Sequence, residues 1–192
     1  MTVAGLLLTG GRSRRLGVDK AELVLDGATL AARAATRLGA VCDPVLEVGP
    51  GRSELPVVRE DPPGSGPLVA LAAGGRALFG QGHDGDAILL AVDLPAMTVA
   101  FLELLRDRPG VRTVVPEVGG RLQPVCARYG RDAMAAADRL VREGVRSLHE
   151  LLAAVEHAVL AEEEWRAVVG PDVFADVDTP DDARRLGVEL GA

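Results

Sequence analysis

Hydrophobic residues in this chain gather in short continuous runs that are separated by longer segments with helical patterning. Runs typical of strands cover residues 3–8, 44–48, 56–59, 86–92, 112–116 and 122–127. Segments with helical patterning cover residues 30–38, 68–79, 99–106 and 131–143. A continuous apolar run such as the first one indicates a strand buried on both faces of a parallel sheet. The alternation therefore predicts a three-layer α/β fold with a mostly parallel sheet.

Length and composition favour one domain over residues 1–192. Of these residues 48% are hydrophobic, which suffices for a large core, but only 3% are aromatic, so aliphatic side chains must fill most of it. The sequence has no run of eighteen apolar residues and no basic, apolar leader, which predicts a cytoplasmic protein without a membrane segment. Cys42 and Cys126 have no CxxC spacing or nearby histidine, so we expect two free, buried thiols.

The first predicted strand runs into a loop rich in glycine and arginine, LLLTGGRSRRLGVDK, which ends at Lys20. Glycines allow positive φ and let a ligand approach the main chain, so successive N–H groups can turn toward an anion. Lys20 is the only lysine of the chain, and the other 20 basic side chains are arginines. Because an ammonium is a compact point charge that fits between phosphate oxygens, Lys20 is a candidate phosphate ligand.

The charge of this loop differs from that of the whole chain. Four basic side chains and one acidic side chain give the first twenty residues a local excess of three positive charges, whereas the chain carries a formal charge of −7. A positive loop on an acidic protein predicts a small polyanionic ligand and argues against a nucleic-acid surface. A plain strand-to-helix turn with solvated arginines is the alternative that the loop alone leaves open.

Spacing excludes two well-known phosphate-binding loops. A Walker A loop needs adjacent Gly-Lys followed by a hydroxyl residue, but Asp19 precedes Lys20 and Ala21 follows it. A dinucleotide fingerprint needs GxGxxG, and Arg12 and Arg15 stand where its second and third glycines belong. A hydride-transfer enzyme is therefore not indicated.

The loop instead resembles the signature LAGGxSxRMGxDKxxL of nucleotidyltransferases with a Rossmann-like, glycosyltransferase-A-like fold, and most of all that of the MobA-like molybdenum cofactor guanylyltransferases. Thr9 stands where alanine is usual, and Leu16 where methionine is usual. The resemblance implies that the loop wraps a nucleoside triphosphate, with Lys20 and Arg15 neutralising its charge. It further implies nucleotide contacts from the loop residues Leu8, Thr9, Gly10, Gly11, Arg12 and Ser13.

Later segments match the same family in order. Asp61 and Gly66 lie in a segment that resembles the family's ED…GPL stretch, which holds the nucleoside. Asp93 ends an apolar run and resembles the metal-binding aspartate of the PCDxP motif, although Ala91-Val92 replaces Pro-Cys. The remaining matches are GRLQPVCAR (120–128), GVRSL (144–148), which would open a late helix, and FADVDTPDDA (174–183). The last match departs from the family, because Asp176 and Asp178 replace asparagines.

The residues alone give a compatible interpretation of the aspartates. Asp93 comes where a buried strand emerges at its carboxyl end, the usual ligand crevice of open α/β sheets, and a carboxylate there suits Mg²⁺. Its alternative role, capping a helix that begins near Thr98, fails because five residues is too far. Asp178 or Thr179 can cap a helix that has Pro180 as its first residue, and a metal role for Asp178 is compatible with capping.

The resemblance thus implies a GTP:molybdopterin guanylyltransferase that uses Mg²⁺ on Asp93, with GTP and molybdenum-molybdopterin as substrates. The three histidines show no catalytic spacing, but the attacking phosphate monoester needs no general base, since its second pKa is about 6. Two alternatives stay open: cytidylyl transfer, favoured by Asp176 and Asp178, and a nucleotide-binding regulator without catalysis. A transient contact with a molybdenum insertase or an acceptor chaperone is an expectation drawn from the resemblance.

Overall fold

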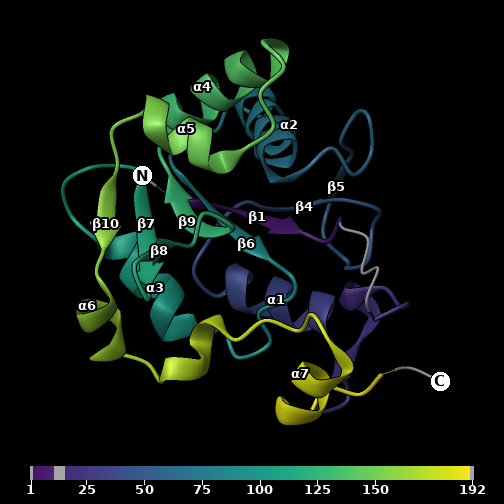
Figure 1. The fold of residues 1–192 in the computed structure, drawn as a ribbon. Helices are drawn as coiled ribbons and strands as arrows, with labels where there is room; N and C mark the ends of the chain where they lie inside the picture. Colours follow the sequence, from purple (N-terminus) through teal and green to yellow (C-terminus); the bar gives the residue numbers. More distant parts are fainter. Residues whose placement is uncertain (1, 11–15, 191–192) are drawn as a thin grey trace.

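The computed structural model describes residues 2–10 and 16–190 and has a central sheet between two helical layers (Figure 1). Seven strands follow one path in the order β10-β7-β9-β6-β1-β4-β5, and β8 pairs with β7. The strands are β1 (Ala4–Leu8), β4 (Val45–Val48), β5 (Val57–Val58), β6 (Ala87–Ala91), β7 (Val114–Val118), β8 (Arg121–Leu122), β9 (Cys126–Tyr129) and β10 (Ala158–Leu160). Pairing is parallel along β6-β1-β4-β5 and between β10 and β7, and β9 is antiparallel to both of its neighbours. The predicted α/β class with a mostly parallel sheet is confirmed.

Helices cover both faces of this sheet, as Figure 1 shows. One face carries α2 (Pro67–Gly80), α4 (Arg131–Arg142) and α5 (Leu148–Ala154), and the other carries α1 (Leu30–Gly39) and α3 (Val99–Asp107). Successive residues of β1 alternate between the two cores, since Leu6 and Leu8 pack toward the first group and Leu7 toward the second. The three-layer arrangement follows from burial of both faces of the sheet.

Two adjacent glycines bring α2 unusually close to its neighbours. A Cβ atom on Gly74 would lie 2.7 Å from Leu6 Cδ2, and one on Gly75 would lie 3.1 Å from Met134 Cβ. A side chain at position 74 would therefore displace Leu6 of β1, and one at position 75 would press against Met134 of α4. The close packing places the first turn of α2 beside the carboxyl end of β1, where the predicted site lies.

The C-terminal segment crosses below the second face and includes α6 (Glu162–Arg166), the 3₁₀ helix η2 (Pro171–Phe174) and α7 (Pro180–Arg185). Trp165 and Phe174 of this segment pack edge to face against Phe101 of α3, with ring centroids 5.0 to 6.2 Å apart. The fully buried Trp165 also donates its indole N–H to the carbonyl oxygen of Glu117 at 3.0 Å. Three of the few aromatic residues therefore tie the C-terminal segment to the sheet.

We expect Trp165→Ala to lower the free energy of unfolding by about 3–5 kcal/mol, because it removes a fully buried ring and leaves a cavity. Urea denaturation followed by circular dichroism measures the loss. The control is Val168→Ala in the same segment, whose side chain is 51% exposed, and its change should stay below about 0.5 kcal/mol. Equal effects of the two substitutions would show that the aromatic cluster does not stabilise the fold.

The prediction of one strand over residues 122–127 is wrong. The structure has two short strands there, β8 and β9, separated by residues 123–125. Gln123 N–H extends the pairing of β8 with β7 by donating to the carbonyl of Pro116 at 2.8 Å, and the next residue, Pro124, cannot donate to a strand ladder. The helices agree with prediction to within a residue or so, the late helix implied by GVRSL is α5, and both cysteines are free and buried as expected. Burial raises the pKa of Cys42 to about 12.

Several short elements went unpredicted, because none has a periodic pattern of its own. They are the hairpin β2 (Val24–Leu25) and β3 (Ala28–Thr29), the 3₁₀ helix η1 (Lys20–Glu22), α6 and η2. Among the described residues, no helix is both long and apolar enough to cross a membrane.

Candidate active site

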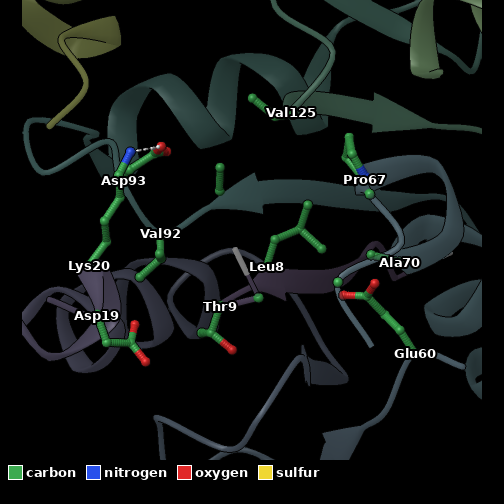
Figure 2. A pocket seen from close by; sticks show the side chains of 14 residues that line it. Leu8, Thr9, Asp19, Lys20, Glu60, Pro67, Ala70, Val92, Asp93 and Val125 are labelled. Atoms are coloured by element: carbon green, nitrogen blue, oxygen red, sulfur yellow. Dashed lines mark hydrogen bonds and ion pairs between the residues drawn. The ribbon is translucent and has the colours of Figure 1, made fainter. Parts of the chain in front are cut away.

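A cavity of about 310 Å³ opens at the carboxyl ends of the adjacent strands β1 and β6 (Figure 2). The chain leaves β1 toward β4 on one side and returns to β6 on the other, so the cavity lies at a topological switch point of the sheet, where open α/β folds bind ligands. Its walls come from the end of β1, the η1 turn, the loop before α2 and the end of β6. The lining residues are Leu8, Thr9, Gly10, Asp19, Lys20, Glu60, Gly64, Gly66, Pro67, Ala70, Ala91, Val92, Asp93 and Val125.

Most predicted site residues that the structure describes meet at this cavity. Its lining includes six of them, Leu8, Thr9, Gly10, Lys20, Gly66 and Asp93, and Asp178 reaches it through its bond to Lys20. Asp61 is exposed and is not among the lining residues, whereas its neighbour Glu60 is. Four predicted residues lie outside the described part of the chain: Gly11, Arg12, Ser13 and Arg15.

Lys20 begins η1, the short turn that Asp19 caps by accepting a hydrogen bond from the Ala21 N–H at 3.0 Å. Its ammonium donates to Asp93 Oδ2 at 2.9 Å, as drawn in Figure 2, and to Asp178 Oδ1. Partial burial lowers the pKa of Lys20, but the two carboxylates more than offset this and leave it above its ordinary value. The only lysine of the chain is thus a permanent cation in the wall of the cavity.

The structure shows that neither Asp93 nor Asp178 caps the helix that follows it. Thr98 caps α3 by accepting from the Phe101 N–H at 3.2 Å, so Asp93 has no part in that cap. Likewise Thr179 caps α7 in a reciprocal capping box with Asp182, which leaves the Asp178 carboxylate free to bind Lys20. Of the two caps that the sequence left open, Thr179 is the one used.

The donor set around Lys20 suits a hard divalent cation. Carboxylates of Asp93 and Asp178 already converge on one positive charge, the ammonium of Lys20, which shows that this place stabilises a cation. Over residues 2–10 and 16–190 no group of three or more potential metal-binding side chains occurs. Two carboxylates can suffice for Mg²⁺, which keeps several waters and takes one or two carboxylates together with substrate phosphates.

Asp176 lies close to this pair without bonding to Lys20. Desolvation and the neighbouring carboxylates of Asp178 and Asp93 raise its pKa, although its side chain is largely exposed. The Val177 N–H donates to the carbonyl oxygen of Asp93 at 3.1 Å. This hydrogen bond holds the terminal motif, more than eighty residues away in sequence, beside the end of β6.

Glu60 is the functional candidate that sequence reasoning missed. The side chain is buried, and burial raises its pKa, partly offset by hydrogen bonds from the Ser65 and Gly64 amides. A Cβ atom on Gly10 would lie 2.9 Å from Glu60 Oε1, so a residue with a side chain at position 10 would press against this carboxylate. The adjacent pair Glu60-Asp61 was the available signal, but a loop has no periodicity to tell which of two neighbours points inward.

A family model and curated relatives match most of the chain. A model of the MobA-like NTP transferase domain matches residues 5–163. A probable molybdenum cofactor guanylyltransferase of Opitutus terrae is 37% identical over 179 residues, which cover 85% of this chain and 88% of that protein.

Solved structures show the same fold. The molybdopterin-guanine dinucleotide biosynthesis protein A of Archaeoglobus fulgidus superimposes with a TM-score of 0.80 at 22% identity, over 96% of both chains. A Mycobacterium tuberculosis protein crystallised in complex with manganese superimposes with a TM-score of 0.60 at 21% identity, over 97% of this chain and 98% of that one. Because the family model matches most of its length, this chain belongs to the MobA-like NTP transferase family.

Proposed function

We propose that the protein is a GTP:molybdopterin guanylyltransferase. A terminal phosphate oxygen of molybdenum-molybdopterin attacks the α-phosphorus of GTP, the bond between the α-phosphorus and the bridging oxygen breaks, and pyrophosphate leaves. The observation that carries the proposal is the junction of Lys20 with Asp93 at the mouth of a glycine-lined cavity. The similarity to guanylyltransferases names the nucleotide and the acceptor.

Catalysis in this site consists of positioning and charge neutralisation. The acceptor phosphate is largely dianionic at neutral pH, so the reaction requires no general base. Lys20 supplies a fixed positive charge, and Arg15 stays a predicted second cation beyond the described residues, together with Gly11, Arg12 and Ser13 as loop ligands. Asp93, with Asp178 beside it, would hold Mg²⁺, which neutralises phosphate charge when bound. Preorganised charge of this kind is the largest catalytic contribution in many enzymes.

The two ends of the cavity suit different parts of the nucleotide. Figure 2 shows Lys20 and Asp93 at one end and Glu60 at the other, with Leu8 between them. Phosphates belong at the cationic end, so the base belongs near Glu60, where the main chain of Leu8, Thr9 and Gly10 is also exposed to it. Asp61 would contact the ribose or base only if the loop shifted on binding.

Glu60 favours guanine over cytosine. An ionised carboxylate only accepts hydrogen bonds, and the guanine edge presents two adjacent donors, N1–H and the N2 amino group. Cytosine presents one amino donor beside an acceptor nitrogen, which a carboxylate would repel. Cytidylyl transfer is the second candidate, because Asp178 contacts Lys20 directly and gives the site a second carboxylate.

Nucleotide binding and turnover together test the proposal. We expect GTP with Mg²⁺ to raise the melting temperature more than ATP, UTP or CTP, and GTP with molybdenum-molybdopterin to release pyrophosphate. Stabilisation by GTP without pyrophosphate release would indicate the nucleotide-binding regulator. A larger shift and turnover with CTP would indicate the cytidylyltransferase.

Asp178→Asn should keep guanylyl transfer within about tenfold, because an amide oxygen can still accept from the Lys20 ammonium. Asp178→Ala should lose roughly a further tenfold, which corresponds to about 1.4 kcal/mol. Initial rates over a Mg²⁺ series measure both variants. Since Thr179 caps α7, neither change should lower the melting temperature appreciably. An asparagine variant as inactive as one that lacks the Asp93 carboxylate would show that two carboxylates are required.

A further inference from the structure

Glu47 is a buried carboxylate that the proposed chemistry does not use. It is the third residue of β4, its side chain is 0% exposed, and an unpaired charge at such a place would be very unfavourable. Its oxygens accept from the amides of Gly51, Arg52 and Ser53 at 2.7 to 2.9 Å and from the Ser53 hydroxyl at 2.6 Å. Burial opposes its ionisation, but these hydrogen bonds outweigh it and hold the pKa of Glu47 below its ordinary value.

This carboxylate joins the loop after β4 to the end of β1. The hydroxyl of Thr9 donates to Glu47, and the Thr9 N–H donates to the carbonyl of Val48 at 3.3 Å. The loop then passes so close that a Cβ atom on Gly49 would lie 2.3 Å from Thr9 Oγ1. Glu47 therefore fixes residues 49–53 against the strand that delivers the phosphate loop.

Arg52 connects this loop to the η1 turn, which contains Lys20. Its amide is held by Glu47, while its guanidinium donates to Asp19 at 2.8 Å and pairs with Glu22 at 3.0 Å. Asp19 caps η1 and Glu22 ends it, so Arg52 grips the turn on both sides of Lys20. A planar guanidinium with several fixed donors suits such a two-carboxylate contact.

We propose that Arg52, anchored by Glu47, is a positioning residue that holds the η1 turn so that the Lys20 ammonium faces the reacting phosphates. The inference rests on the proposed function, in which Lys20 binds those phosphates. Arg52 is substantially exposed, and exposed ion pairs contribute little to stability. Its effect should therefore appear in the rate, because small displacements of a catalytic group can lower a rate by up to about 10²-fold.

A double-mutant cycle with Lys20 tests this relation. Arg52→Ala should lower kcat for guanylyl transfer about tenfold in the wild-type background, but less than twofold in the Lys20→Ala background. Arg52→Lys should recover only part of the loss. It keeps the positive charge, but one ammonium cannot bind both carboxylates as the planar guanidinium does. The control is Arg112→Ala, which removes a comparably exposed ion pair with Asp86 at 2.6 Å, away from the cavity lining, and should leave kcat unchanged. Additive losses in the double variant would overturn the proposal.

Hydrogen–deuterium exchange tests, without turnover, whether the contacts of Arg52 with Asp19 and Glu22 order the η1 turn. In Arg52→Ala, peptides containing residues 20–23 should exchange at least about tenfold faster, while the melting temperature stays within about 2 °C of wild type. Unchanged exchange in this turn would contradict the proposal that Arg52 holds it in place. If the wild-type protein did not transfer guanylyl groups, the proposed function would fail while this experiment still decided whether Arg52 orders the turn.

Discussion

Replacing Lys20 with alanine should lower guanylyl transfer by roughly 10²- to 10³-fold, as removal of one preorganised donor to a transition-state charge does in other enzymes. The ammonium sits in the cavity wall with its charge fixed by Asp93 and Asp178. No other lysine exists in the chain to substitute for it. Initial rates at saturating GTP and acceptor measure the loss.

Lys20→Arg is the matched comparison, since it keeps the positive charge. We expect it to be nearly as inactive as the alanine variant, because the broad guanidinium cannot occupy a point-charge site between two carboxylates and a triphosphate. Full activity in the arginine variant would show that charge alone matters. Near wild-type transfer by Lys20→Ala would remove Lys20 from the mechanism.

Asp93→Asn should lower activity by about 10³-fold or more, since loss of the anionic ligand removes several kcal/mol of metal-dependent charge stabilisation. The Mg²⁺ concentration that gives half-maximal rate should rise, while the melting temperature barely changes, because an amide fills the same space. Rates measured across a wide Mg²⁺ range, together with a melting curve, separate these effects.

Asp86→Asn provides the control for this charge change, because Asp86 precedes the same strand at its opposite end. Its carboxylate pairs with Arg112 and lies 3.9 Å from Arg128, so some loss of stability is expected, but the Mg²⁺ dependence should stay that of wild type. A large stability loss in Asp93→Asn, with activity retained at high Mg²⁺, would favour a structural role for Asp93.

The parts of the site that the sequence predicted share one physical origin. Lys20 follows a buried strand through a glycine-rich loop, and Asp93 follows another buried strand. Because parallel strands end their carboxyl termini at the same edge of a sheet, both side chains could be expected at that edge. That the two strands, β1 and β6, are direct neighbours is a finding of the structure. The C-terminal motif was placed near them only by resemblance, and its contact with Lys20 spans 158 residues.

Sequence reasoning missed Glu47, Glu60 and Arg52, because their contacts leave no periodic pattern in the sequence. Glu47 lies in a strand whose apolar neighbours suggest simple burial. One of its two hydroxyl partners, Thr9, is 38 residues away, and its other partners lie in a loop without a periodic pattern. Glu60 and Asp61 are neighbouring acidic residues that differ in which way the side chain points, and the sequence of a loop does not reveal that direction. Arg52 is one of 20 arginines, and its grip on both sides of Lys20 follows from the path of the loop after β4.

Product analysis from a competition among the four nucleoside triphosphates tests the central claim most directly. The wild-type protein is incubated with Mg²⁺, molybdenum-molybdopterin and equal concentrations of GTP, CTP, ATP and UTP, and the dinucleotide products are identified by mass spectrometry. Recognition of guanine at the Glu60 end of the cavity predicts the guanine dinucleotide in at least about tenfold excess over every other product, corresponding to about 1.4 kcal/mol of discrimination. A predominant cytosine dinucleotide, or no dinucleotide at all, would contradict the account.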